Sequence, residues 1–374
     1  MNSNYPGASE KSKHIEQTDT TASAAVHKLP AQRIGILTAG GDCPGLNAAI
    51  RGVGKTAMLE YGMEVYGISS GFLGMIDKEY AILHEPDVSG ILTLGGTILG
   101  TSREKPFKTE SFTDYIKSKP LIIKETYDEL GLDCLVCIGG NGTMKTAYKL
   151  TETGMNVVGV PKTIDNDVWG TDVSFGFNSA LSIATEAIDR IHTTANSHKR
   201  IMVVEVMGHH TGWLALYSGI AAGGDVILIP EVPYNFDVIE QYLIKRAEQG
   251  KPYSIVVVAE GIQTGDNNKK SAAAYIAKKI QKRTGIATRE TILGYIQRGG
   301  APAAMDRIIA TRLGAYAAKL VSQKEYGFMA AFHGDKVAAV PLRDVAGKLK
   351  KVPLDLSLII KGRALGTCFG DVYP

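Results

Sequence analysis

The residues best suited to chemistry lie in one short stretch, NVVGVPKTIDND, at positions 156–167. Two carboxylates two residues apart in a loop can face one small volume, and their surroundings can separate their pKa values. One carboxylate would then act as a base while the other orients a ligand or a metal. The alternative is a simple turn, because Asp and Asn side chains also turn loops. The polar residues concerned are Lys162, Thr163, Asp165, Asn166 and Asp167.

Two glycine-rich turns, GGDCPG (Gly40–Gly45) and GGNGT (Gly139–Thr143), each separate an apolar run from a helical pattern. Glycines let a backbone approach a phosphate closely, and free N–H groups at a helix N-terminus attract anions. Neither turn has the P-loop spacing or the dinucleotide spacing G-x-G-x-x-G. Two such turns favour a polyphosphate ligand of another kind over turns that only let a strand and a helix pack tightly.

Arginines flank apolar or glycine-rich segments where a mobile surface charge is less expected. The guanidinium group presents a planar fork of donors that suits phosphate. Lys162 would add a compact charge closer to the two carboxylates. The four arginines are Arg103, Arg200, Arg289 and Arg298.

The elements that must position these residues alternate between strand and helix. An apolar run at 157–160 predicts a strand that Pro161 ends, because proline has no N–H to donate. The other predicted strands start at Arg33 and Asp133 or cover Glu64–Ser69, Arg200–Gly208, Asp225–Pro230, Tyr253–Gly261 and Glu290–Gln297. The predicted helices start at Asn47 and after Thr143, or cover 179 to about 197, Asp237–Gln249, Ala272–Thr284 and Ala303–Leu320. The stretch 348–366 predicts a further strand and helix.

Alternating strands and helices predict an α/β fold with mostly parallel sheets and helices on both faces. Right-handed crossovers place every strand–helix turn at one edge of a sheet, and ligands bind outside the carboxyl ends of the strands. This rule brings together the glycine turns, Arg103, the 162–167 loop, Gly208 and Glu260.

Composition narrows the class of protein. The chain has 374 residues, a length that is enough for two domains. Its 44% hydrophobic and 21% charged residues are typical of a globular protein. A net charge of +3 gives no case for nucleic acid, and no apolar run reaches the ~20 residues that span a membrane. Residues 1–31 predict a disordered tail without a secretory signal.

The cysteines are expected to be reduced thiols of a cytoplasmic protein. Cys134 and Cys137 form a C-x-x-C, but residues three apart on a strand point to opposite faces, so they should not share a metal. Cys43 and Cys368 complete the set.

Taken together, these motifs resemble the phosphofructokinase family. The resemblance runs from Arg33 to beyond Leu320, and TIDND followed by IQRGG is its most specific part. The matching segments are GGDCPGLNAAIRG, GGTILGTSR, GGNGT, PKTIDND, SHKRIMVVEVMG, AEG and TRETILGYIQRGGAPAAMDR.

The resemblance implies two Rossmann-like domains with the active site in the cleft between them. Residues 32–176 plus about 298–347 would bind the phosphoryl donor, and 177–297 plus about 348–374 the sugar phosphate. It also implies transfer of a phosphoryl group to the 1-hydroxyl of fructose 6-phosphate with Mg²⁺. Asp165 would take the hydroxyl proton, Asp167 would orient the sugar and the metal, and Thr163 would contact the transferring group. Lys162 and Arg200 complete the implied catalytic set.

The donor and the sugar phosphate have separate implied contacts. Residues matching Arg200 and Arg289 reach in from a neighbouring subunit, which implies a homodimer or homotetramer with shared sites. The implied donor contacts are Gly40, Arg103, Glu104, Gly140, Asn141, Gly142 and Thr143. The implied sugar-phosphate contacts are Thr163, Ile164, Asp165, Arg200, Met207, Gly208, His209, Glu260, Arg289, Tyr295, Ile296, Gln297 and Arg298.

Departures from the family pattern bear on the donor. Gly142 leaves room for ATP where the pyrophosphate-using branch carries aspartate, whereas Lys162 and Tyr295 are typical of that branch. We therefore expect ATP, with pyrophosphate as the alternative. Asn141 replaces an aspartate that contacts the metal, and His209 replaces an arginine. Because of these two changes, a third hypothesis is that the chain is not primarily an enzyme but a regulatory subunit that binds a sugar phosphate and has weak catalytic activity.

Two further expectations concern ligands. Positions that match effector-binding residues of the family hold Arg51, Lys55 and His192, of which only Arg51 is retained, and the two changes argue against regulation by a nucleoside diphosphate. A longer sugar phosphate such as sedoheptulose 7-phosphate is an alternative acceptor, because a 6-phosphate clamp does not fix the number of carbons.

Overall fold

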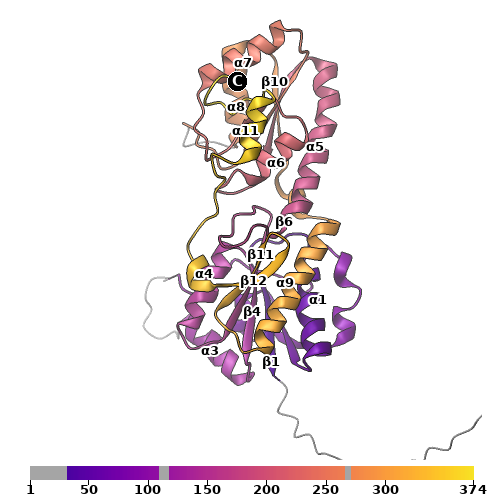
Figure 1. The fold of residues 1–374 in the computed structure, drawn as a ribbon, viewed down its shortest axis with the longest axis vertical. Coiled ribbons are helices and arrows are strands. Elements are labelled where there is room, and N and C mark those ends of the chain that lie inside the picture. Colours follow the sequence, from indigo (N-terminus) through magenta and orange to yellow (C-terminus); the bar gives the residue numbers. More distant parts are fainter. Residues whose placement is uncertain (1–31, 109–117, 266–270) are drawn as a thin grey trace, which may run out of the picture. The chain divides into compact units, whose positions relative to one another are not determined.

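The computed structural model describes residues 32–108, 118–265 and 271–374. The predicted disordered tail, residues 1–31, lies outside the described residues. An eight-stranded sheet runs in the order β12–β11–β5–β4–β1–β2–β3, with β6 paired to β5 (Figure 1). Its edge strands β3 and β12 are antiparallel to their neighbours and the others are parallel. The strands are β1 (Arg33–Ala39), β2 (Glu64–Ile68), β3 (Tyr80–Leu83), β4 (Cys134–Gly139), β5 (Val157–Thr163), β6 (Phe175–Gly176), β11 (Phe328–His333) and β12 (Lys336–Pro341).

Helices cover both faces of this sheet, because its central strands are apolar on both sides. On β4, Cys134 and Val136 belong to one buried cluster, with residues of α1 and α9, while Cys137 belongs to the other, with residues of α2, α3 and α4. The C-x-x-C therefore divides between opposite faces, as predicted, and all four cysteines are buried and free. The helices on the two faces include α1 (Leu46–Lys55), α9 (Ala304–Ser322), α2 (Phe72–Asp77), α3 (Lys119–Glu129) and α4 (Asn141–Thr151).

Helices α1 and α9 lie side by side (Figure 1). Their backbones approach closely at Gly52, where a Cβ would lie 2.8 Å from the carbonyl oxygen of Thr311. The remaining short helical segments around this sheet are η1 (Thr56–Glu60), η2 (Glu85–Val88), η3 (Ile91–Thr93) and α10 (Leu342–Val345).

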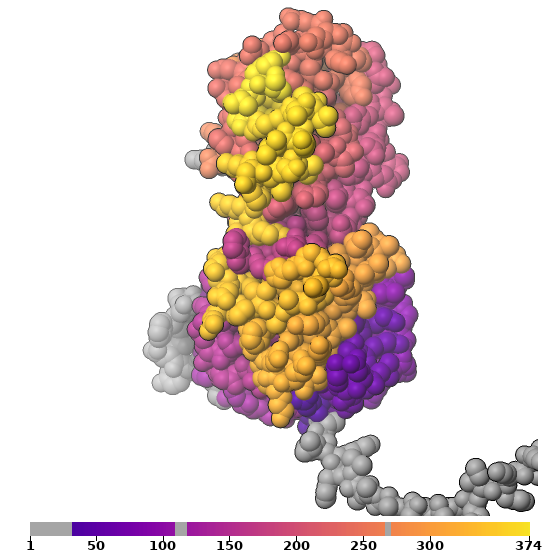
Figure 2. Space-filling model, in the orientation of Figure 1, coloured from indigo at the N-terminus to yellow at the C-terminus, as the bar shows by residue number. Residues whose placement is uncertain are grey.

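A second, four-stranded sheet is parallel throughout, in the order β10–β7–β9–β8. The last helix, α11 (Ser357–Ala364), packs against α6 at Gly362, and Figure 2 shows the C-terminal segment in yellow on the face presented. The strands are β7 (Ile201–Val206), β8 (Val226–Leu228), β9 (Ser254–Ala259) and β10 (Thr288–Ile292). The helices are α5 (Phe177–His198), α6 (Trp213–Ala221), α7 (Phe236–Glu248) and α8 (Ala272–Thr284). Among the helices described, none is both long and apolar enough to cross a membrane.

Three predicted elements were wrong in part. Strand β5 continues through Pro161 to Thr163. Pro161 is the last residue that pairs with β4, and β6 pairs with the next two residues, so the missing N–H falls where the strand changes partner. The predicted strand Glu290–Gln297 ends at Ile292 and gives way to a 3-10 helix, η4 (Gly294–Arg298). In the stretch 348–366 only α11 forms, with a single bridge from Leu349 to Val168 in place of a strand.

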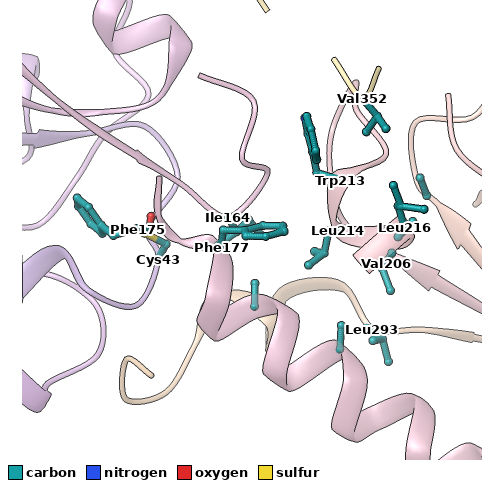
Figure 3. Close-up of a cluster of buried hydrophobic side chains, with 14 of the residues drawn as sticks. Cys43, Ile164, Phe175, Phe177, Val206, Trp213, Leu214, Leu216, Leu293 and Val352 are labelled. Atoms are coloured by element: carbon teal, nitrogen blue, oxygen red, sulfur yellow. The ribbon is translucent and has the colours of Figure 1, made fainter. Parts of the chain in front are cut away.

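A buried apolar cluster surrounds the loop that follows β5. Figure 3 shows Ile164 beside Phe177, and Phe175 beside Cys43. Ile164 is fully buried and anchors the loop in the core, while its polar neighbours Thr163 and Asp165 are each only 8% exposed. The packing of this apolar anchor therefore sets where the two carboxylates lie.

Candidate active site

A cavity of about 640 Å³ lies at the carboxyl edge of the larger sheet. It is lined by the residues that follow β1, β4 and β5, as the topology predicts for a parallel sheet. Thirteen of the predicted site residues line it: Gly40, Arg103, Glu104, Gly140, Asn141, Gly142, Thr143, Lys162, Thr163, Asp165, Asp167, His209 and Arg298.

The loop with the two carboxylates is held by one local hydrogen bond and by bonds from two other segments of the chain. Thr163 Oγ1 accepts a bond from the Asp165 N–H at 3.0 Å, and the Thr211 hydroxyl donates to the Asp165 carbonyl at 3.4 Å. The Asp167 carbonyl accepts from Asn141 Nδ2 at 3.1 Å. Asn166, between the carboxylates, adopts a left-handed backbone with φ of 50°, and both of its neighbours line the cavity.

Burial gives Asp165 the properties of a base. Its side chain is 8% exposed, and its Oδ1 accepts no hydrogen bond from the described residues. Desolvation, reinforced by the nearby Asp167 carboxylate, raises the pKa of Asp165 from 3.8 to about 6. Burial also raises the pKa of Asp167. The loop therefore contains a carboxylate that is ionised at neutral pH but binds a proton readily.

Lys162 connects this loop to the first glycine turn. Its side chain is 3% exposed, and its ammonium donates to the Gly41 carbonyl. Desolvation by burial lowers the pKa of Lys162. Arg298 reaches the same turn and donates from Nη1 to the Asp42 carbonyl at 3.1 Å. Two cations are thus fixed against the turn that follows β1, where they would face an anion in the cavity.

The second glycine turn opens α4 and presents its N-terminus to the cavity. Gly140 is the N-cap, and Asn141, Gly142 and Thr143 form the first turn. A Cβ built on Gly142 would meet no heavy atom within 4 Å, so this position is open. Free N–H groups in the first turn of a helix attract phosphate, and the missing side chain leaves them accessible.

Asn141 has the one group in this turn that suits a divalent cation. Its Oδ1 is buried and accepts no hydrogen bond from the described residues, while its Nδ2 is held by the Asp167 carbonyl. Mg²⁺ binds oxygen ligands and usually keeps one or two carboxylates, waters and substrate phosphates around it. A neutral amide oxygen next to the Asp167 loop fits that set of donors.

The predicted sugar-phosphate residues that follow β7, β9 and β10 form a second group. The backbone N–H of His209 donates to Glu260 Oε1 at 2.8 Å, and the Met207 N–H donates to Gln297 Oε1 at 3.3 Å. His209 and Arg298, the last residue of η4, also line the cavity. The other members of the group are Gly208, which precedes His209, and Tyr295 and Ile296 of η4, which are 73% and 59% exposed.

Arg200 and Arg289 lie elsewhere. Arg200 directly precedes β7 and Arg289 is the second residue of β10, so both lie at the amino ends of parallel strands. From the smaller sheet the cavity is reached by His209 and Arg298, which follow the carboxyl ends of β7 and β10, and neither Arg200 nor Arg289 lines it. Within one chain, the structure does not bring these two cations to the carboxylates.

Sequence reasoning missed a basic wall of the cavity. Lys145 and Lys149 follow Asn141 at intervals of four residues, so they lie on one face of α4, and this spacing could have revealed them. The Lys149 ammonium lies 5.1 Å from the centre of the Phe107 ring. The other missed lining residues are Ala39, Gly41, Phe72, Ser102, Lys105, Lys108 and Thr146.

Comparisons with known proteins agree with this geometry. Residues 33–321 match the family model described as phosphofructokinase. The chain is 59% identical over 338 residues to ATP-dependent 6-phosphofructokinase 3 of Bacteroides thetaiotaomicron, a match that covers 90% of this chain and 100% of that protein. It is 55% identical over 363 residues to ATP-dependent 6-phosphofructokinase of Spirochaeta thermophila, covering 92% of this chain and 99% of the relative.

A solved structure gives the same result at lower identity. The crystal structure of Pichia pastoris phosphofructokinase in the T-state superposes with a TM-score of 0.74 and 34% identity. The match covers 84% of this chain and 35% of that one, so this chain spans about a third of the yeast chain. The family model and the relatives together cover nearly the whole described chain, and the chain belongs to the phosphofructokinase family.

Proposed function

We propose that this chain is an ATP-dependent 6-phosphofructokinase, which phosphorylates the 1-hydroxyl of fructose 6-phosphate to give fructose 1,6-bisphosphate and ADP. The observation that carries the proposal is Asp165, a buried carboxylate with a raised pKa and an unpaired oxygen at a cavity lined by two glycine turns and several lysines. Two relatives named for this activity match this chain over 100% and 99% of their own length.

The reaction needs one proton transfer and one displacement. Asp165 takes the proton from the 1-hydroxyl, the hydroxyl oxygen bonds to the γ-phosphorus of ATP, and the bond to the β–γ bridging oxygen breaks. ADP leaves with that bonding pair. Thr163 lies directly before residues 164–172, here called the base loop, and would contact the transferring group. Positioning and charge neutralisation lower the barrier of such a transfer more than covalent chemistry does.

The donor would lie along the larger sheet. Gly40 and the first turn of α4 offer backbone N–H groups, and Arg103, Lys162 and the basic face of α4 supply positive charge. Glu104 is paired with Lys119 at 3.0 Å and would shape this wall without repelling phosphate. We assign donor binding to 32–176 plus about 298–347.

Magnesium would be held by Asn141 Oδ1 together with a carboxylate of the Asp165–Asp167 loop. When bound, it would neutralise charge on the phosphate groups of the donor. The residues of this chain would supply an amide oxygen in place of a second carboxylate, so we expect weaker metal binding than an aspartate would give.

The sugar phosphate would lie across the group that follows β7, β9 and β10. Glu260, His209 and Met207 would line the sugar, and Arg298 and Tyr295 would hold the 6-phosphate. We assign this role to 177–297 plus about 348–374. Arg200 and Arg289 would enter from a second copy of the chain, because each lies at the wrong edge of its own sheet to reach the carboxylates.

Pyrophosphate is the second candidate donor, and Lys162 favours it. This buried ammonium lies against the first glycine turn, where it would neutralise a compact, highly charged donor. The open space at Gly142 favours ATP, because nothing there excludes a nucleotide.

The proposal is tested by product analysis. The purified chain, Mg²⁺ and ATP are incubated with fructose 6-phosphate or sedoheptulose 7-phosphate, and ³¹P NMR follows a new phosphomonoester signal from a 1-phosphate. We expect fructose 1,6-bisphosphate and ADP in equal amounts. If the chain alone forms no product, the hypothesis of a regulatory subunit is favoured. If only sedoheptulose 7-phosphate is phosphorylated, fructose 6-phosphate is rejected as the acceptor.

A further inference from the structure

Lys350, which is distant in the sequence, binds the base loop through its ammonium group. Lys350 Nζ donates to Asn166 Oδ1 at 3.0 Å and to the carbonyls of Thr171 and Asp172 at 2.9 and 2.8 Å. All three donor positions of an ammonium group are therefore used on one loop. Lys350 does not line the cavity, so it would not touch a substrate there.

The backbone around Lys350 is tied to the same loop. The Lys350 N–H donates to the Asp167 carbonyl at 2.9 Å, and Leu349 forms an antiparallel bridge with Val168. The side-chain and backbone bonds of one residue thus fix both ends of the segment from Asn166 to Asp172. This segment lies directly beside the two carboxylates.

Asn166 is the residue through which Lys350 would act. Asn166 is buried, has a left-handed backbone, and lies between Asp165 and Asp167 in the sequence. Its Oδ1 also accepts from the Ser174 N–H at 3.1 Å, so Lys350 and Ser174 together hold the side chain in one orientation. A left-handed non-glycine residue persists only where its surroundings hold it.

Lys350 also connects the base loop with the loop that carries His209. The Trp213 indole N–H donates to the Lys350 carbonyl at 2.8 Å, and the Lys350 ammonium lies 5.3 Å from the centre of the Trp213 ring. Two residues on, the Val352 N–H and the Gly212 N–H share the carboxylate of Glu231. The base loop and the loop that carries His209 are thus both bound to the backbone segment 350–352.

We propose that Lys350 is a positioning residue for phosphoryl transfer, fixing the Asp165–Asp167 loop through Asn166 without touching either substrate. The proposal rests on the proposed function, because it assigns Lys350 to that reaction. A displacement of about 1 Å at a reacting group costs about 100-fold in rate. Loss of positioning should therefore lower kcat while the binding of both substrates is kept.

The test compares Lys350→Met with Lys351→Met. Lys351 is the next residue, is exposed, and makes no hydrogen bond or ion pair with the rest of the described chain. We expect Lys350→Met to lose about 10- to 100-fold in kcat, with KM for fructose 6-phosphate and for ATP within about threefold of wild type. Lys350→Arg, which keeps a cation with several donors, should recover most of the loss. Lys351→Met should match wild type.

A second variant keeps the proposal testable if Lys350→Met folds poorly. Asn166→Gly removes the acceptor of Lys350 but tolerates the positive φ. If Lys350 acts through Asn166, the double variant should lose no more than the worse single variant, because the two changes break one interaction. Amide hydrogen exchange at 165–172 should quicken in Lys350→Met and not in Lys351→Met.

Several results would overturn the inference. They are an unchanged kcat in folded Lys350→Met, a loss confined to thermal stability, equal damage from Lys351→Met, or multiplicative losses in the double variant. Wild type is assayed first with fructose 6-phosphate and MgATP. Inactive wild type would reject the proposed function, whereas active wild type with an unaffected Lys350→Met would reject only the role of Lys350.

Discussion

Replacing Gly142 with aspartate should exclude ATP without harming the fold. Gly142 is the second residue of α4 and lines the cavity, and a Cβ there would meet no heavy atom within 4 Å. A carboxylate in the first turn of a helix stabilises the helix by about 0.3–1 kcal/mol. The variant should therefore melt at or slightly above the temperature of wild type.

The loss of activity follows from charge. Like charges 4 to 8 Å apart repel by about 4 to 2 kcal/mol at an effective dielectric constant of about 20, which is about 1000- to 30-fold in kcat/KM for MgATP. Gly142→Asn adds nearly the same volume without the charge and should lose much less. The assay couples ADP formation to NADH oxidation at saturating fructose 6-phosphate.

The comparison of the two variants decides the reasoning. Equal losses in Gly142→Asp and Gly142→Asn would show that volume matters and charge does not. An unchanged kcat/KM for MgATP in Gly142→Asp would show that the donor does not lie against the first turn of α4. Rising salt should weaken the effect of the aspartate if its origin is electrostatic.

Further predictions concern the base, the metal, the subunits and the thiols. Because burial raises the pKa of Asp165 to about 6, kcat/KM should fall as the pH drops through about 6, since the protonated carboxyl cannot accept a proton; a pH profile flat to pH 5 would contradict this. The pKa of Asp165 in the folded chain lies above the ordinary 3.8, so its ionised carboxylate opposes folding, in full above pH 6. Asp165→Asn should therefore be inactive yet up to about 3 kcal/mol more stable than wild type at pH 7.5, as measured by urea melts. This gain in stability should disappear toward pH 4. Asn141→Asp should lower the Mg²⁺ concentration for half-maximal rate about tenfold, measured by metal titration; an unchanged midpoint would remove Asn141 from the metal site. Mixing inactive Asp165→Asn with inactive Arg289→Ala, then refolding them together, should restore about a quarter of wild-type activity in random dimers, whereas no recovery would mean that sites are not shared. The four buried thiols should react with a thiol reagent only on unfolding, because burial raises their pKa values, and prompt reaction of the native chain would disprove their burial.

Much of the site was predictable because it follows the edge rule of parallel sheets. The glycine turns after β1 and β4 and the carboxylates after β5 meet at one cavity, and each carries a local signal in residue type. The alternation of strands and helices likewise predicted the sheets and most element bounds. The domain assignment and the role of each side chain stay predictions.

What the sequence could not show depends on tertiary contacts. Pro161 looked like a strand end because proline lacks an N–H, but β5 changes partner there. The pattern at 290–297 suits a strand, yet the chain turns into η4 after Ile292. Lys350 lies 184 positions from Asn166 and has no motif around it, so only the fold reveals their hydrogen bond.

The most direct test of the proposed function is the ratio of kcat/KM for MgATP to kcat/KM for pyrophosphate, both measured with fructose 6-phosphate as acceptor and Mg²⁺ in excess. The open position at Gly142 predicts a ratio far above one. A ratio far below one, with robust turnover on pyrophosphate, would contradict the ATP assignment and make Lys162 the residue that selects the donor.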